Sequence, residues 1–209
     1  MPLVRMELLR NRAIGTGLRS MTLVSAIMMA TLVVGPFYLS GALGLGSAQT
    51  GLVMTVGPGV AALTGAPAGR LIDQLGSARV VVAGLVAVMV GALLLAVLPG
   101  QFGVGGYVAS LIIVTFGYAL FQAANTTTVL QAAKNEERGV TSALLGLSRN
   151  LGLIADASAM GTIYAMGPRA FEVVGLQSGP ETGLQVTFAV AACLAGLALG
   201  SALWGRCGK

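Results

Sequence analysis

The fold is decided by residues 80–133, which read VVVAGLVAVMVGALLLAVLPGQFGVGGYVASLIIVTFGYALFQAANTTTVLQAA. This stretch contains no Asp, Glu, Lys or Arg, and a second uncharged stretch covers residues 20–69. Each is about fifty residues long, whereas one helical bilayer crossing needs roughly 20 apolar residues. Each stretch therefore predicts two membrane-spanning helices joined by a short turn, at the glycine-rich segments 40–47 and 99–106.

The composition of the chain also indicates a membrane protein. Hydrophobic residues make up 56% and charged residues 9% of the 209 residues, and the mean hydropathy is +0.87. A soluble domain carries about a quarter charged residues, and the continuous apolar runs do not alternate as the strands of a membrane β-barrel do. The sequence predicts an all-α membrane protein, a single bundle of six transmembrane helices over residues 1–209. The predicted spans are 14–39, 50–69, 79–98, 106–129, 140–166 and 184–204.

The basic residues predict how this bundle is oriented. Nine of them lie on one side of the six-helix arrangement and one, Arg169, on the other. The nine are Arg5, Arg10, Arg12, Arg70, Arg79, Lys134, Arg138, Arg206 and Lys209. Because basic loops remain inside, we expect both termini in the cytoplasm of a bacterium and the chain in its cytoplasmic (inner) membrane. The net charge of +5 then reflects topology, and no nucleic-acid partner is expected because no aromatic platform lies between the scattered basic residues.

The sequence offers few residues that could support catalysis or bind a metal. The chain has no histidine, and its seven carboxylates are scattered. A metal site needs several converging ligands and a catalytic triad needs a nucleophile beside a base. We therefore expect no enzyme activity, no metal and no cofactor.

The segment between the second and third predicted helices carries the most specific motif. Residues 69–79 read GRLIDQLGSAR. This resembles the cytoplasmic signature loop of the major facilitator superfamily, Gly-x-Leu-x-Asp-Arg-x-Gly-Arg-Lys/Arg. The matching positions are Gly69, Leu71, Asp73 and Gly76. Other residues replace the usual basic ones at Gln74, Ser77 and Ala78, and Arg79 supplies a charge one position late. Glycine permits the tight turn, and Asp73 can pair with an arginine or cap a helix N-terminus. The alternative is an ordinary charged hairpin.

The order of motifs along nearly the whole chain resembles the C-terminal six-helix half of drug:proton antiporters in that superfamily. The similar segments are LLRNR (8–12), PFYL (36–39), GPG (57–59), QAANT (122–126), RGVTSA (138–143) and SRNLGLI (148–154). The resemblance implies a two-bundle multidrug efflux transporter that exchanges a small amphipathic compound for protons by alternating access. Its substrate site would lie between the halves, near the middle of the bilayer.

An intact member of this family has a second six-helix bundle, which this chain lacks. We expect either a separately encoded complementary half, pairing with a second copy of this chain, or a truncated gene product. The alternative function is a non-transporting membrane fragment or accessory subunit that only packs against a partner bundle. An upstream reading frame encoding six further helices would favour a transporter.

Two charged residues of the fifth predicted helix are candidates for function. Placing Asp or Arg near the centre of a membrane helix costs about 2.5–3.5 kcal/mol on insertion scales. Asp156 is near the centre, and burial there favours its neutral form, so it is our candidate for carrying the coupling proton. Arg149, two turns earlier, shares its face and can line the same substrate cavity. The alternatives are a structural Asp156 and an Arg149 that extends to the interface.

Polar residues of the fourth predicted helix are the other candidates. Gln122 and Asn125 are three residues apart and share a face. They predict either interhelical hydrogen bonding or contact with substrate. We also expect Pro36, Pro58 and Pro67 to bend their helices. The small residues Ala192, Gly196 and Gly200 predict a ridge that brings another helix close.

Overall fold

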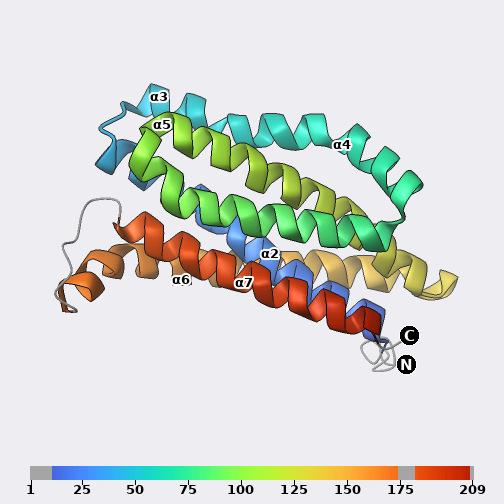
Figure 1. Ribbon diagram of the computed structural model, residues 1–209. Helices are drawn as coiled ribbons and strands as arrows, with labels where there is room; N and C mark the ends of the chain where they lie inside the picture. The colour runs from blue at the N-terminus through green and yellow to red at the C-terminus, as the bar shows by residue number, and fades with distance from the viewer. Residues whose placement is uncertain (1–10, 174–181, 208–209) are drawn as a thin grey trace.

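The computed structural model describes residues 11–173 and 182–207, which form helices and contain no strand (Figure 1). The helices lie side by side in one bundle, and each of the six predicted spans falls on helix. The elements are α2 (Arg12–Phe37), the π-helix η1 (Tyr38–Ala42), α3 (Ser47–Met54), α4 (Val56–Leu75), α5 (Ser77–Ala132), the 3₁₀-helix η2 (Asn135–Glu137), α6 (Arg138–Val173) and α7 (Thr182–Cys207).

Helix α5 contains two arms that fold back on each other at Gly103 (Figure 1). Gly103 has φ 56° and ψ −130°, a conformation that glycine adopts without the steric cost of a Cβ. This confirms the turn predicted at residues 99–106. The arms approach closely at glycines: a methyl group on Gly91 would lie 2.6 Å from the Val114 nitrogen, and one on Gly117 would lie 2.7 Å from the Val88 nitrogen.

Prolines explain two of the three expected irregularities. Proline lacks an N–H and clashes with the carbonyl four residues earlier. The break between α3 and α4 at Thr55 lies just before Pro58, and the π-helix η1 begins two residues after Pro36. Pro67, in contrast, lies inside α4, which continues through it.

Helix α2 is the centre of the bundle. It packs against α5, α6 and α7, and its buried positions recur at helical spacing. Fully buried large side chains of the core include Ile14, Ile27, Tyr38, Leu85, Leu95, Tyr107, Phe121 and Phe188. Helix α4 is peripheral, because among the longer helices it packs against α5 alone, and only Thr64 and Ala68 of its residues are buried.

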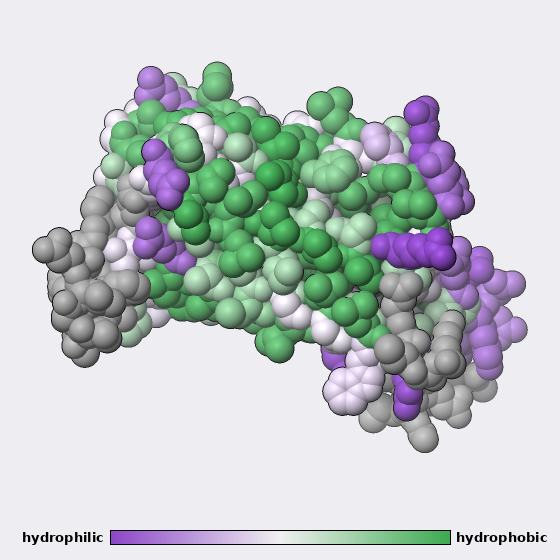
Figure 2. Space-filling model, viewed as in Figure 1, coloured by the Kyte–Doolittle hydropathy of each residue, from purple (hydrophilic) through white to green (hydrophobic). Residues whose placement is uncertain are grey.

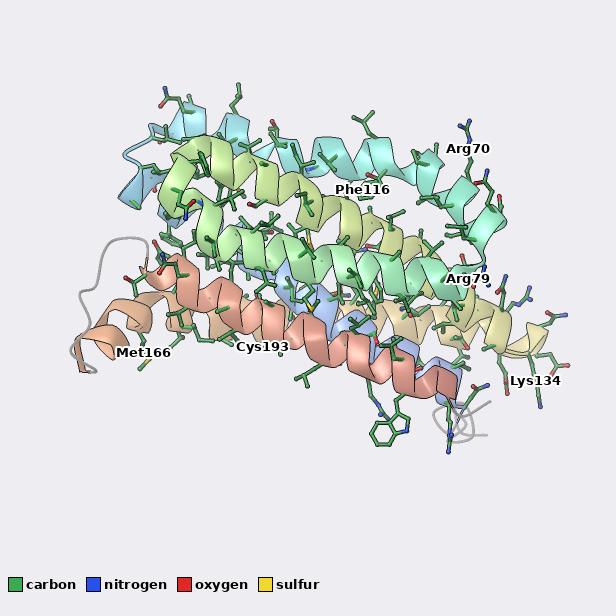
Figure 3. All side chains as sticks on the ribbon, in the orientation of Figure 1. Arg70, Arg79, Phe116, Lys134, Met166 and Cys193 are labelled. Carbon is green, nitrogen blue, oxygen red and sulfur yellow. The ribbon has the colours of Figure 1, made fainter. Side chains whose placement is uncertain are left out.

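The polar residues gather at the two ends of the bundle (Figure 2). Hydrophobic side chains form a belt between these ends, as expected for a bundle surrounded by lipid. Arg70, Arg79 and Lys134 lie at one end and Met166 at the other (Figure 3). Helix α2 begins and α7 ends at the end that carries these basic residues. Arg5, Arg10 and Lys209 lie outside the described residues, as do the side chains of Arg169 and Arg206.

Four helical runs of the described residues are long and apolar enough to cross a membrane: 12–42, 47–75, 77–132 and 182–204. The run 77–132 contains both arms of α5. Helix α6 is not among the four, although it runs alongside α2 and α7. Its apolar sequence is interrupted by strongly polar residues such as Arg149, Asn150 and Asp156. The chain is therefore an all-helical membrane protein, while six crossings and the orientation of the ends stay predictions.

The predicted ridge on α7 is wrong within this chain. Ala192 is buried, but a methyl group added at Gly196 or Gly200 would meet nothing within 4 Å. Neighbouring helices are therefore not drawn close at these glycines. Close approach occurs instead at Gly152 of α6, against the Thr22 carbonyl of α2, and between the α5 arms.

Candidate functional site

The predicted signature loop forms the turn between α4 and α5. Gly76 has φ 83° and ψ 143°, and its N–H donates to the Ile72 carbonyl at 2.9 Å. Its own carbonyl accepts from the Arg79 N–H at 3.2 Å. The glycine therefore makes the reversal that the motif predicted, because few other residues adopt this conformation.

The other motif residues differ in burial. Leu71 packs against the core, whereas Gly69, Asp73 and Arg79 are exposed. Within the described part of the chain, Asp73 makes neither an ion pair with Arg79 nor a capping bond to α5, which begins without a side-chain cap. The Ser77 hydroxyl instead donates to the Gln131 amide oxygen at 3.5 Å, joining the two ends of α5. Asp73 is therefore open to solvent at the basic end of the bundle.

Asn125 lies in the interior and joins two helices. It is 3% exposed, and its Nδ2 donates to the Gly17 carbonyl of α2 at 3.0 Å. This is the interhelical hydrogen bond that the sequence offered as one of two interpretations. Asn125 also lines a cavity of about 310 Å³ between α2, both arms of α5 and α7. The lining residues are Ala13, Thr16, Gly17, Ser20, Ala78, Val81, Val82, Asn125, Thr128 and Ala202.

Gln122 does not line this cavity. Its side chain is half-buried one turn before Asn125. The hydroxyls of Thr127 and Thr128 donate to carbonyls of their own helix, at 2.9 and 2.8 Å. The Gln122 amide makes no side-chain hydrogen bond within the described residues, so it is available to a ligand or another helix.

Asp156 is buried in α6, one turn after the contact of Gly152 with α2. It is 2% exposed, and its Oδ2 has no hydrogen-bond partner within the described part of the chain. Residues four apart share a helix face, and at Gly152 a methyl group would meet the Thr22 carbonyl and lie 3.0 Å from Ser25 Cβ. The Ser25 hydroxyl is also buried without a hydrogen bond there. The Ser25 hydroxyl therefore lies at the α2–α6 contact, and helical spacing puts the buried carboxylate of Asp156 on the same side of α6.

Arg149 is exposed, unlike Asp156. The helical spacing puts both residues on nearly one side of α6, but neither lines the cavity that contains Asn125. The structure thus puts Asn125 in the wall of a cavity and buries Asp156 within the bundle, and it leaves Arg149 at the surface.

The α2 side of the cavity was not predicted from the sequence. Ala13, Thr16, Gly17 and Ser20 recur at intervals of three and four, so they form one small and weakly polar face of α2. That spacing was visible in the sequence. The residues of α5 and α7 that complete the cavity were not predictable, because they are more than fifty positions away in the chain. The Ser20 hydroxyl, for example, hydrogen-bonds with Ser201 of α7 at 3.3 Å.

Comparison with known proteins identifies the family. The model of the Major Facilitator Superfamily matches residues 2–155. An uncharacterized transporter, YebQ of Escherichia coli strain K12, is 30% identical over 158 residues, which are 75% of this chain and 34% of that protein. The chain thus spans about a third of the length of this curated relative. Both matches point to transport and away from enzyme activity. With its apolar helical bundle, the chain belongs to the Major Facilitator Superfamily.

Proposed function

We propose that this chain forms one six-helix half of a proton-coupled efflux transporter for small amphipathic compounds. The family match supports transport, and the unpartnered carboxylate oxygen of Asp156, buried in α6, is the observation that carries the coupling. A transporter of this kind works by alternating access around a site between two bundles. This proposal therefore includes a complementary bundle or a second copy of the chain.

The proposed topology has six crossings, with α6 as the fifth. Both termini and the α4–α5 turn face the cytoplasm of a bacterial inner membrane. The gathering of Arg70, Arg79 and Lys134 at one end of the bundle supports this orientation (Figure 3). Single cysteines at Ser77 and at Ser178, which lies outside the described residues, are expected to react from opposite sides of intact cells. Labelling of both from the same side contradicts the six-crossing topology.

Asp156 is the proposed carrier of the coupling proton. Burial disfavours a charged carboxylate, so the site can take up a proton without needing a partner cation. A transporter must also release that proton, which requires water to reach Asp156 in another conformation. Rearrangement of the α2–α6 contact would provide that access, because the unpartnered Ser25 hydroxyl lies at it and helical spacing puts the carboxylate on the same side of α6.

Gln122 and Arg149 are the proposed contacts to substrate, and Asn125 is proposed to hold α2 and α5 together. Gln122 has a half-buried amide and Arg149 an exposed guanidinium, whereas the Asn125 Nδ2 is already bonded to Gly17. Asp73 is proposed to support gating, since it is exposed at the turn between two helices. Asp73→Asn is then expected to slow transport while leaving substrate binding largely intact.

The decisive test uses vesicles that contain this chain together with the part of the E. coli relative that it does not match. Uptake of a fluorescent lipophilic cation is followed with and without an imposed pH gradient. Asp156→Asn is expected to abolish pH-driven transport and to keep exchange of the compound down its own gradient. The matched control is Glu136→Gln, which removes an exposed carboxylate in the α5–α6 connection. Full pH-driven transport by the Asp156→Asn variant contradicts the proposal.

A further inference from the structure

We propose that the cavity between α2, α5 and α7 holds an acyl chain of an acidic phospholipid, whose headgroup lies against Arg12 and Arg79. Nothing in the transport cycle proposed above uses this cavity. It is partly open, and its described wall residues come from α2, α5 and α7, from Ala13 and Ala78 to Asn125 and Ala202. The lipid would act as a structural ligand that fills the space between these helices.

The size and chemistry of the cavity favour an apolar chain. Its volume of about 310 Å³ is at the lower end of the range for small-molecule sites, so it holds only part of a larger ligand. Alanine, valine and glycine form most of its wall. The hydroxyls of Thr16 and Thr128 donate to carbonyls of their own helices, and Asn125 Nδ2 donates to Gly17.

Those hydrogen bonds leave few donors for an anionic group in the interior. An anion needs several donors, and the hydroxyls of Thr16 and Thr128 and one of the two Asn125 amide hydrogens already donate to backbone carbonyls. The Ser20 hydroxyl shares a hydrogen bond with Ser201, which leaves the second Asn125 hydrogen as the free side-chain donor among the described wall residues. A buried anion without donors would be costly. The charged part of the ligand must therefore remain outside the cavity, where cations are available.

Two exposed arginines, each next to a wall residue in the chain, complement an acidic headgroup. Arg12 and Arg79 are exposed, and each directly adjoins a residue of the wall, Ala13 and Ala78 respectively. The ten wall residues include no acid. Basic pockets between membrane helices at the cytoplasmic side bind acidic lipid headgroups in this way.

Lipid is the occupant that can reach this site directly. Helix α7 presents apolar side chains to its surroundings, with Leu203 44% and Trp204 81% exposed, two residues or fewer from the wall residue Ala202. A tryptophan near the end of a membrane helix is typical of the membrane–water interface. Trp204 is also the single tryptophan of the chain, so its fluorescence reports on the lipid around this end of α7.

The test measures quenching of Trp204 fluorescence in phosphatidylcholine vesicles that contain a small fraction of brominated lipid. Brominated phosphatidylglycerol is expected to quench more than brominated phosphatidylcholine at equal fraction. Arg12→Gln combined with Arg79→Gln is expected to reduce this preference roughly tenfold. Arg70→Gln, at the same end but away from the cavity wall, is the matched control and is expected to keep the preference.

A second variant tests the cavity itself. Ala78→Phe fills the space without changing charge and is expected to remove the preference for phosphatidylglycerol. Ala62→Phe, on the exposed face of α4, is its control.

Equal quenching by the two lipids in the unmodified chain overturns the proposal. If Arg70→Gln loses the preference for phosphatidylglycerol as much as the double variant does, the proposal is also overturned, because general charge attraction would then explain the preference. A preference that persists in Ala78→Phe overturns the role of the cavity. None of these results depends on transport.

Discussion

The two arms of α5 and the helix α4 use glycine in opposite ways. In α5, Gly84 and Gly91 lie where the arms touch, and a methyl group on either would lie 2.6 Å from a backbone nitrogen of the other arm. In α4, a methyl group on Gly59, Gly65 or Gly69 would meet nothing within 4 Å. Glycines therefore allow close packing between the arms of α5, whereas these glycines of α4 face open space.

The α5 arms pack against each other within the chain, whereas the outer face of α4 is uncovered by the other described residues. Lipid is as apolar as the helix surfaces, so helices associate in a bilayer through close packing and hydrogen bonds, for which small residues are suited. The α5 arms have both partners within the chain. The outer face of α4 has none within the described residues, although its composition is equally suited to packing. Substitutions in the two regions test whether this difference in packing is also a difference in the free energy of unfolding.

The largest effect is expected from Gly91→Ala. Its methyl group would be forced against the Val114 backbone, which can move only if the two α5 arms separate. Overpacking of this kind costs about 3 kcal/mol at the upper end of the usual range. Unfolding of the purified chain in detergent, followed by circular dichroism, measures the loss.

The control for Gly91→Ala is Gly65→Ala in α4, where the methyl group has open space. It is expected to stabilise α4 by about 0.5–1 kcal/mol, because alanine favours helix. Equal destabilisation by the two substitutions would remove the contrast between α5 and α4.

A smaller effect is expected from Gly76→Ala in the α4–α5 turn. Gly76 has φ 83° and ψ 143°, which strains any residue with a Cβ by about 2 kcal/mol. Gly69→Ala, in the helical part of the same motif, is expected to be neutral or slightly stabilising, since nothing lies within 4 Å. The free energy of unfolding of both variants checks this, and an unchanged Gly76→Ala variant would contradict the role assigned to the turn glycine.

The smallest effect is expected from Asn125→Leu. It removes the bond to the Gly17 carbonyl, and interhelical hydrogen bonds in membranes are worth about 1 kcal/mol. Gln122→Leu is the matched control, because it removes a half-buried amide one turn away that does not line the cavity. If Gln122→Leu destabilises the chain more than Asn125→Leu, the assignment of Asn125 as the residue that joins α2 and α5 is wrong.

Local features of the fold were predictable from the sequence because they depend on near neighbours. The turns at 40–47 and 99–106 follow from clustered glycines, and the reversal at Gly76 follows from the loop motif. The break before Pro58 follows from a missing donor. The ridge on α7 was not predictable in the same way, because small residues favour a close contact only where another helix is present.

The candidate site was predictable only as a set of residue types. The sequence singled out Asp156 and Asn125 as polar residues in apolar helices. Such residues are costly in a membrane and are usually paired or functional. It could not distinguish the buried Asp156 from the exposed Arg149, which share one side of α6 by spacing. Burial depends on which helix packs at each level of α6, and that depends on residues far away in the chain.

The sequence by itself determined that this protein is helical and lies in a membrane, because long uncharged stretches and local turn residues act through solvation and backbone geometry alone. The loop motif and the order of segments along the chain also indicated its family. Only the tertiary structure decided which glycines touch another helix, that Asn125 bonds to Gly17, and that a cavity lies between α2, α5 and α7. Those properties depend on residues far apart in the chain, and their positions follow from the packing of whole helices.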